Sequence, residues 1–181
     1  MKKYEFTGVS QPWIKGKTLH QIRAVRDFGN VHAGDIGGFI EKEYNLSHQG
    51  KAWITRDAKA YGDSKIYGNA LITGCALISG DAKVYGNASV GGQSHIFGNA
   101  IICDYARIKR TTDYISISGF GESGGNITAF MSGDEIFMVC GNFNGSTHDF
   151  YAKMVEQYGN NKYTVEYFEL IDLIKLHFNK R

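Results

Sequence analysis

The sequence is poor in proline and cysteine, and it has no long apolar run. One proline among 181 residues excludes collagen-like and proline-rich linker proteins, even though glycine is frequent, at 23 residues. The three cysteines form no Cys-x-x-Cys pair, so we expect neither a disulfide framework nor a thiolate zinc site. A reducing, cytoplasmic setting is the default for such a chain. No apolar run reaches the roughly 18 residues of a membrane span, so we expect none.

An excess of charge of either sign is also missing. The formal net charge is only +2, which is too near neutral for a protein that coats DNA. Two lysines near the N-terminus are not followed by an apolar stretch, so we expect no secretory leader. Apolar residues make up 43% of the chain and charged residues 21%, which is enough for a packed core in one domain with a small appendage.

The most regular feature is a six-residue repeat that runs without insertion over residues 50–109. Its ten units read GKAWIT, RDAKAY, GDSKIY, GNALIT, GCALIS, GDAKVY, GNASVG, GQSHIF, GNAIIC and DYARIK. The third position is Ala or Ser in all ten units, the fifth is Ile or Val in nine, and the first is Gly in eight. Alternating inward and outward residues are typical of a β-strand, and the Gly-Asn or Gly-Asp pair then turns the chain.

A strand too short to stand alone, followed by a turn in every unit, predicts a coil with three sides. The third and fifth residues are expected to fill a narrow interior, with stacked rungs about 4.8 Å apart. An amphipathic helix needs a period of about 3.6 residues, which a strict period of six does not supply. We therefore predict a mainly β fold built around a short parallel β-helix.

These units resemble the hexapeptide-repeat family, whose fold is a left-handed parallel β-helix. Residues 19–54 are also similar to the start of the YdcK-type hexapeptide-repeat proteins of bacteria and their phages, which are described as acyltransferases by analogy of fold. The resemblance implies a homotrimer packed along the coil axis. It also implies a phage-encoded protein that acts in the bacterial cytoplasm.

Three segments are predicted: an N-terminal β cap over residues 1–49, the β-helix over 50–109 and a small α+β module over 110–181. In the cap, residues 19–25 predict one or two short strands, and residues 44–49 fit an imperfect eleventh hexad. We expect this segment to plug the first coil, which would otherwise expose unpaired backbone.

The C-terminal module is predicted to have the order βββαα. Residues 114–118, 126–131 and 135–140 predict its strands. Ser146 followed by Asp149 predicts a helix start, and Asn161 opens a second helix. The module also resembles a C-terminal module of phage-encoded proteins, and no activity comes with that resemblance.

Candidate binding residues form two basic groups and one apolar group. Arg107, Lys109 and Arg110 are predicted to form an anion pocket, with a solvated basic edge as the other interpretation. A second predicted ligand group in the cap consists of Arg23, Arg26 and His32. Outward apolar residues predict an oligomer or partner interface, or a surface covered by the protein's own termini: Leu71, Leu77, Phe97 and Ile101.

No catalytic residue, metal or cofactor is predicted. Strand residues follow the glycine-rich stretch 119–125, which favours a hairpin turn over a phosphate loop, although its amides can nest an anion. His95 is the only histidine in the ten hexads, which disfavours a zinc site and an acyltransferase base. Pairs such as Lys65 and Tyr67 are interpreted as cross-rung stabilisers, with nucleic-acid binding less favoured.

We therefore predict a non-catalytic binding protein, an accessory or counter-defence factor of phage origin. Its partner is expected to be a host protein or a phosphorylated small molecule, such as an anionic signalling nucleotide. Two alternatives stay open at this point: an acyltransferase that uses acetyl-coenzyme A, and a structural or assembly protein.

Overall fold

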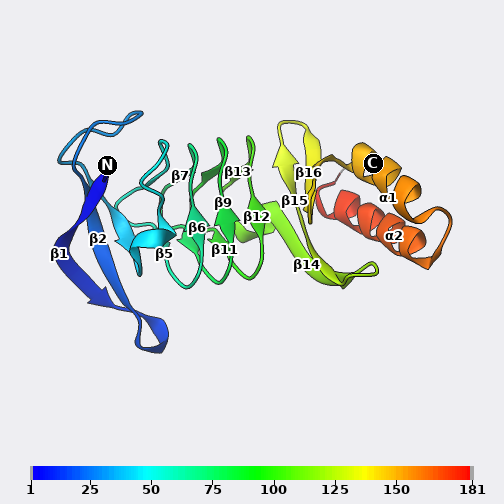
Figure 1. Ribbon diagram of the computed structural model, residues 1–181, viewed down its shortest axis with the longest axis horizontal. Helices are drawn as coiled ribbons and strands as arrows, with labels where there is room; N and C mark the ends of the chain where they lie inside the picture. Colours follow the sequence, from blue (N-terminus) through cyan, green and yellow to red (C-terminus); the bar gives the residue numbers. More distant parts are fainter. Residues whose placement is uncertain (1, 180–181) are drawn as a thin grey trace. The chain divides into compact units, whose positions relative to one another are not determined.

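The computed structural model describes residues 2–179 and is mainly β, with a parallel β-solenoid and two C-terminal helices (Figure 1). The predicted fold class is confirmed in these respects, while the left-handed sense of the coil stays a prediction. The chain divides into two units, residues 1–111 and 112–181. Each unit buries apolar side chains of its own.

Each hexad contributes one short strand to the solenoid, and strands three units apart pair in parallel. Leu71, for example, lies between Trp53 and Ser89 in one wall. The stacked coils are visible in Figure 1. The strands are β4 (Trp53–Ile54), β5 (Lys59–Ala60), β6 (Lys65–Ile66), β7 (Leu71–Ile72), β8 (Leu77–Ile78), β9 (Lys83–Val84), β10 (Ser89–Val90), β11 (His95–Ile96), β12 (Ile101–Ile102) and β13 (Arg107–Ile108).

The third and fifth residues of every hexad fill the interior, as predicted. All twenty of these side chains are at most 1% exposed. The two serines among them keep their hydroxyls bonded, since Ser64 Oγ donates to Tyr61 O at 3.0 Å and Ser94 Oγ donates to Gly91 O at 2.8 Å. The strict spacing therefore gives a continuous apolar column, which is the main source of stability in such a coil.

The N-terminal segment forms an antiparallel sheet of β1 (Tyr4–Pro12), β2 (Thr18–Ala24) and β3 (Ile36–Ile40). The predicted strand over residues 19–25 corresponds to β2, whereas β1 and β3 were not predicted. β3 also pairs in parallel with β5, so the sheet continues one wall of the solenoid. Within residues 44–49, Leu46 bridges to Ile66 after a 3-10 turn, and the Ser47 amide donates to Ile66 O at 2.8 Å.

The N-terminal segment also covers outward positions of the first coil. Trp53 is 4% exposed and packs its ring 5.4 Å from that of Phe28. Tyr61 is 7% exposed and lies 6.1 Å from the Trp13 ring. At this end of the solenoid, therefore, the protein's own N-terminal segment provides the cover.

The C-terminal unit has the order ββββαα, with one strand more than predicted. Its antiparallel sheet contains β14 (Tyr114–Phe120), β15 (Gly125–Ser132), β16 (Glu135–Cys140) and the additional β17 (Phe143–Ser146). The helices are α1 (Thr147–Tyr158) and α2 (Lys162–His177). They pack against the sheet through a core that includes Ile127, Met138, Phe150 and Ile171.

The predicted caps of both helices are confirmed. Ser146 Oγ accepts a hydrogen bond from the Asp149 amide at 3.1 Å, and Asn161 Oδ1 accepts one from the Tyr163 amide at 2.9 Å. Gly159 ends α1. Among residues 2–179, no helix combines the length and the hydropathy that crossing a bilayer requires.

Candidate functional site

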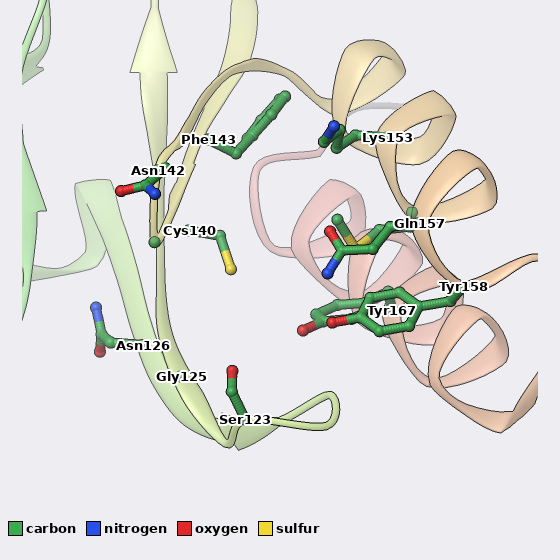
Figure 2. A pocket seen from close by; sticks show the side chains of 12 residues that line it. Ser123, Gly125, Asn126, Cys140, Asn142, Phe143, Lys153, Gln157, Tyr158 and Tyr167 are labelled. Atoms are coloured by element: carbon green, nitrogen blue, oxygen red, sulfur yellow. The ribbon is translucent and has the colours of Figure 1, made fainter.

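A cleft of about 600 Å³ lies between the sheet edge and the helices of the C-terminal unit (Figure 2). Its lining comes from the β14–β15 turn, the β16–β17 turn and both helices. The residues are Ser123, Gly125, Asn126, Cys140, Gly141, Asn142, Phe143, Lys153, Met154, Gln157, Tyr158 and Tyr167. Figure 2 shows the side chains of Cys140 and Gln157 directed toward one another across this space. The fold thus brings together polar and aromatic groups from segments that are separate in sequence.

The glycine-rich turn 119–125 forms one end of the cleft and is fixed to α2. The Gly121 amide donates to Glu166 Oε2 at 2.7 Å. Gly121 has a φ of 70°, and a side chain there would overlap the Tyr167 hydroxyl. The predicted hairpin turn is confirmed. One of the amides proposed to nest an anion already binds a carboxylate of the same chain.

The inner wall of the cleft is uncharged at neutral pH. Burial, with added effects of Cys140, Tyr158 and Glu166, raises the pKa of Tyr167 to about 12. Burial also raises the pKa of the Cys140 thiol. Both groups therefore keep their protons at pH 7 and can donate hydrogen bonds. Lys153, at the rim, has its ammonium 3.1 Å from Glu156 Oε2, so its charge is locally balanced.

Aromatic rings stiffen this wall. The Tyr158 and Tyr167 rings lie 6.1 Å apart at 26°, and Phe150 meets the Tyr167 ring edge-on at 5.4 Å. Phe143 packs 5.1 Å from Phe150. Packed rings have few rotamers, so a ligand would meet a surface that is already formed.

Two of the three basic residues that were predicted to form an anion pocket line a smaller recess on the solenoid. Arg107 and Lys109 border a hollow of about 170 Å³ beside Gly91, together with Thr73 and Ser89. Arg110 is not part of this lining. The sequence therefore selected two residues that share a hollow, and missed the hydroxyl groups from the neighbouring rungs.

The predicted cationic group in the cap has three different environments. Arg23 pairs with Glu5 across β1 and β2. Arg26 is half-buried, and its Nε has no hydrogen-bond partner among the described residues. His32 is exposed, with Nδ1 3.9 Å from Asp35 Oδ2. A shared ligand site for these residues stays a prediction.

The four predicted interface residues lie on different walls of the solenoid. Leu71 belongs to the wall of β4, β7, β10 and β13, and Ile101 to that of β6, β9 and β12. Leu77 and Phe97 accompany the wall of β5, β8 and β11. Leu71 is 41% exposed and Phe97 51%, whereas Leu77 and Ile101 are half-buried. A trimer that uses all four would need contacts around the whole coil.

His95 has a serine neighbour that its sequence position did not reveal. Its Nε2 lies 2.7 Å from Ser79 Oγ on the adjacent rung. Burial lowers the pKa of His95, so the imidazole is neutral at pH 7. The two residues are sixteen apart in sequence, and sorting the outward positions by wall would have placed them together.

No group of three or more His, Cys, Asp or Glu side chains within residues 2–179 is placed to hold a metal ion. The free cysteines Cys75, Cys103 and Cys140 differ in burial, from exposed to buried.

A local similarity to a known protein accompanies this geometry. A stretch of 49 residues, 26% of the chain, is 43% identical to the uncharacterized acetyltransferase YdcK of Escherichia coli (strain K12). The alignment spans 15% of the length of that protein. No protein-family model matches the chain. The local similarity and the parallel solenoid agree with the resemblance to hexapeptide-repeat proteins, while an origin in a phage stays a prediction.

Proposed function

We propose that the protein is a binding protein whose C-terminal cleft holds a nucleobase or a similar uncharged planar heterocycle. The observation that carries this proposal is the 600 Å³ cleft with its aromatic and amide lining. Pockets for small molecules commonly measure about 300–1,000 Å³ and combine apolar walls with a few polar groups.

The lining offers both contacts that a heterocyclic base uses. Tyr158 presents an aromatic ring supported by Tyr167, and stacking on such rings stabilises a bound base by about 1–3 kcal/mol. The Gln157 amide, which faces the cleft in Figure 2, can donate to and accept from one base edge. The hydroxyl of Ser123 enters from the turn.

The charge of the cleft favours the base over a phosphate. Lys153 is the only lining residue with a formal charge at pH 7, and it is paired with Glu156. Residues 110–181 carry six basic and nine acidic side chains. We therefore expect a nucleoside to bind at least as well as its monophosphate. The ligand predicted from the sequence was an anionic nucleotide, and the cleft is proposed to bind only the base of such a molecule.

Calorimetric titration of the full chain with adenosine, guanosine, cytidine and uridine tests the proposal. Replacement of Tyr158 by Leu should weaken binding about five- to hundredfold because a stacking surface is lost. Gln157→Ala should weaken it about two- to tenfold through the loss of a neutral hydrogen bond.

Glu169→Ala is the matched control, because this exposed residue of α2 does not line the cleft. It should leave the affinity unchanged. If none of the four nucleosides binds, or if Tyr158→Leu binds them as the parent chain does, the cleft is not a base site.

An acetyltransferase is the second candidate, supported by the local similarity to YdcK. Its most suitable base in the solenoid is His95, neutral and bonded to Ser79. A binding protein should release no free coenzyme A thiol from acetyl-coenzyme A. If the parent chain releases the thiol and His95→Gln releases it more slowly, the result would favour the enzyme.

Binding of a host protein, a trimeric state and an assembly role remain predictions, and sedimentation can test the trimer.

A further inference from the structure

We infer that the recess beside Gly91 on the solenoid is a binding site for the phosphoryl group of a small molecule. The site belongs to residues 50–109 and is independent of the base-binding cleft proposed above. It lies on the wall of β4, β7, β10 and β13, where the sixth residue of one hexad is a glycine, Gly91, and has no side chain.

Glycine at this position leaves room for the Thr73 hydroxyl at the edge of the recess. The sixth residues of four stacked hexads on this wall are Thr55, Thr73, Gly91 and Lys109. A side chain at Gly91 would overlap Thr73 Oγ1, so that hydroxyl borders the hollow. The recess measures about 170 Å³. At about 30 Å³ per water molecule, this is room for several waters or one tetrahedral oxyanion.

The groups around the hollow suit a phosphoryl oxygen. Thr73 and Ser89 supply hydroxyl donors, and Arg107 and Lys109 supply two cations from the next rung. Arg107 uses Nη1 to donate to Asn87 O at 3.1 Å and Ala106 O at 3.3 Å. These carbonyls orient the guanidinium without neutralising it, because a carbonyl oxygen carries no formal charge. Its other N–H groups are able to bind an oxyanion.

The net charge of the whole repeat region is positive, as is the charge of the recess. Residues 50–109 contain seven basic and four acidic side chains. A phosphate would therefore be attracted to the coil, and the recess would fix its position. A flat basic edge would attract anions too, but that attraction would not depend on the residue at position 91.

Inorganic phosphate is the probe, titrated into the isotopically labelled full chain and followed by the amide resonances of residues 89–92 by nuclear magnetic resonance. Gly91 does not have a left-handed φ, so Gly91→Ala puts a methyl group against Thr73 Oγ1 and displaces that hydroxyl at the recess without changing charge. We expect this variant to lose saturable binding. Arg107→Ala should weaken binding about ten- to hundredfold, as for the loss of a charge-assisted hydrogen bond.

Lys83→Ala is the matched control, since it removes an exposed positive charge from another wall. It should leave the dissociation constant nearly unchanged. Equal weakening by Lys83→Ala, or full affinity in Gly91→Ala with an unchanged spectrum elsewhere, would refute the recess as the site. A single-stranded oligonucleotide that binds more tightly than phosphate and ignores Gly91→Ala would assign the surface to nucleic acid instead.

Discussion

At the scale of single residues, glycine acts here through the space that it leaves. Gly91 leaves room for the Thr73 hydroxyl beside the recess, and Gly121 allows α2 to approach the β14–β15 turn. The two cases differ in backbone conformation, because only Gly121 has a positive φ, at 70°. Gly121 therefore meets two separate demands, one steric and one conformational.

Gly121→Ala should destabilise the C-terminal unit by about 2–4 kcal/mol, because strain in a left-handed conformation adds to a clash with Tyr167. Gly133→Ala provides the comparison, since Gly133 has a φ of 63° and open space around its Cα. It should cost only the conformational part, about 1–2 kcal/mol. Urea unfolding followed by far-ultraviolet circular dichroism reports on α1 and α2. Equal losses in the two variants would show that the contact with Tyr167 has no energetic weight.

At the scale of elements, the short strands of the solenoid depend on stacking. Each has two residues, one of which enters the column while the other faces out. Isolated strands of this length would not persist in water, so their stability comes from the rungs on either side. The inward and outward residues of one strand should therefore differ sharply in their effect on stability.

Ile72→Ala should lower the free energy of unfolding by about 2–5 kcal/mol, because the side chain is fully buried and the column cannot collapse around the gap. Leu71→Ala, one residue earlier on the same strand, should cost less than about 1 kcal/mol because Leu71 is 41% exposed. Both tryptophans, Trp13 and Trp53, lie in the first unit, so their fluorescence during urea unfolding measures these losses. A similar loss in both variants would mean that Leu71 is covered in solution, as in a trimer.

The elements that were predicted are those whose pattern is local. The hexads repeat one rule, and the caps at Ser146 and Asn161 involve residues within one turn of each other. β1 was missed because its alternation of apolar and polar residues covers only Tyr4 to Thr7 and is interrupted at Gly8. β17 was missed because Asn144 and Gly145 are typical of turns, and pairing with β16 overrides that preference.

The candidate sites were predictable to different degrees for the same reason. Arg107 and Lys109 are two residues apart on one strand wall, so their proximity followed from the period. The cleft joins Ser123, Cys140 and Gln157, which the chain places in a turn, a strand and a helix. Only tertiary packing brings such groups together, and the sequence contains no spacing rule for it.

At the scale of the whole molecule, a buried lysine makes the free energy of unfolding of the first unit depend on pH. Lys3 is fully buried, and its Nζ donates to Ala52 O at 2.6 Å. Burial, with a smaller effect of Arg26, lowers the pKa of Lys3 from 10.5 to about 8. Between these values the unfolded chain binds more protons than the folded one. The contribution of Lys3 to the free energy of unfolding should therefore rise with pH across this range.

The parent chain should gain stability relative to Lys3→Met as the pH rises from about 8 toward 10.5. Comparing the two chains removes the common effect of tyrosine ionisation. Tryptophan fluorescence during urea unfolding at several pH values gives the difference. Lys2→Met is the matched control, because it removes an exposed lysine, paired with Glu43, at the neighbouring position. A pH-independent difference for Lys3→Met would mean that Lys3 keeps its ordinary pKa in the folded chain.

All ten hexads place the same kinds of residue in the interior, so the solenoid can be shortened or lengthened by whole hexads. Because every wall accepts the same small and aliphatic residues, one unit can be removed and the remaining units can still stack. Loss of one hexad would turn every later residue onto the neighbouring side. Loss of three consecutive hexads would leave every later residue on its original wall, one complete coil nearer the N-terminal end. The outward residues of such a solenoid can therefore be moved to another wall by adding or removing hexads, while the buried residues stay the same.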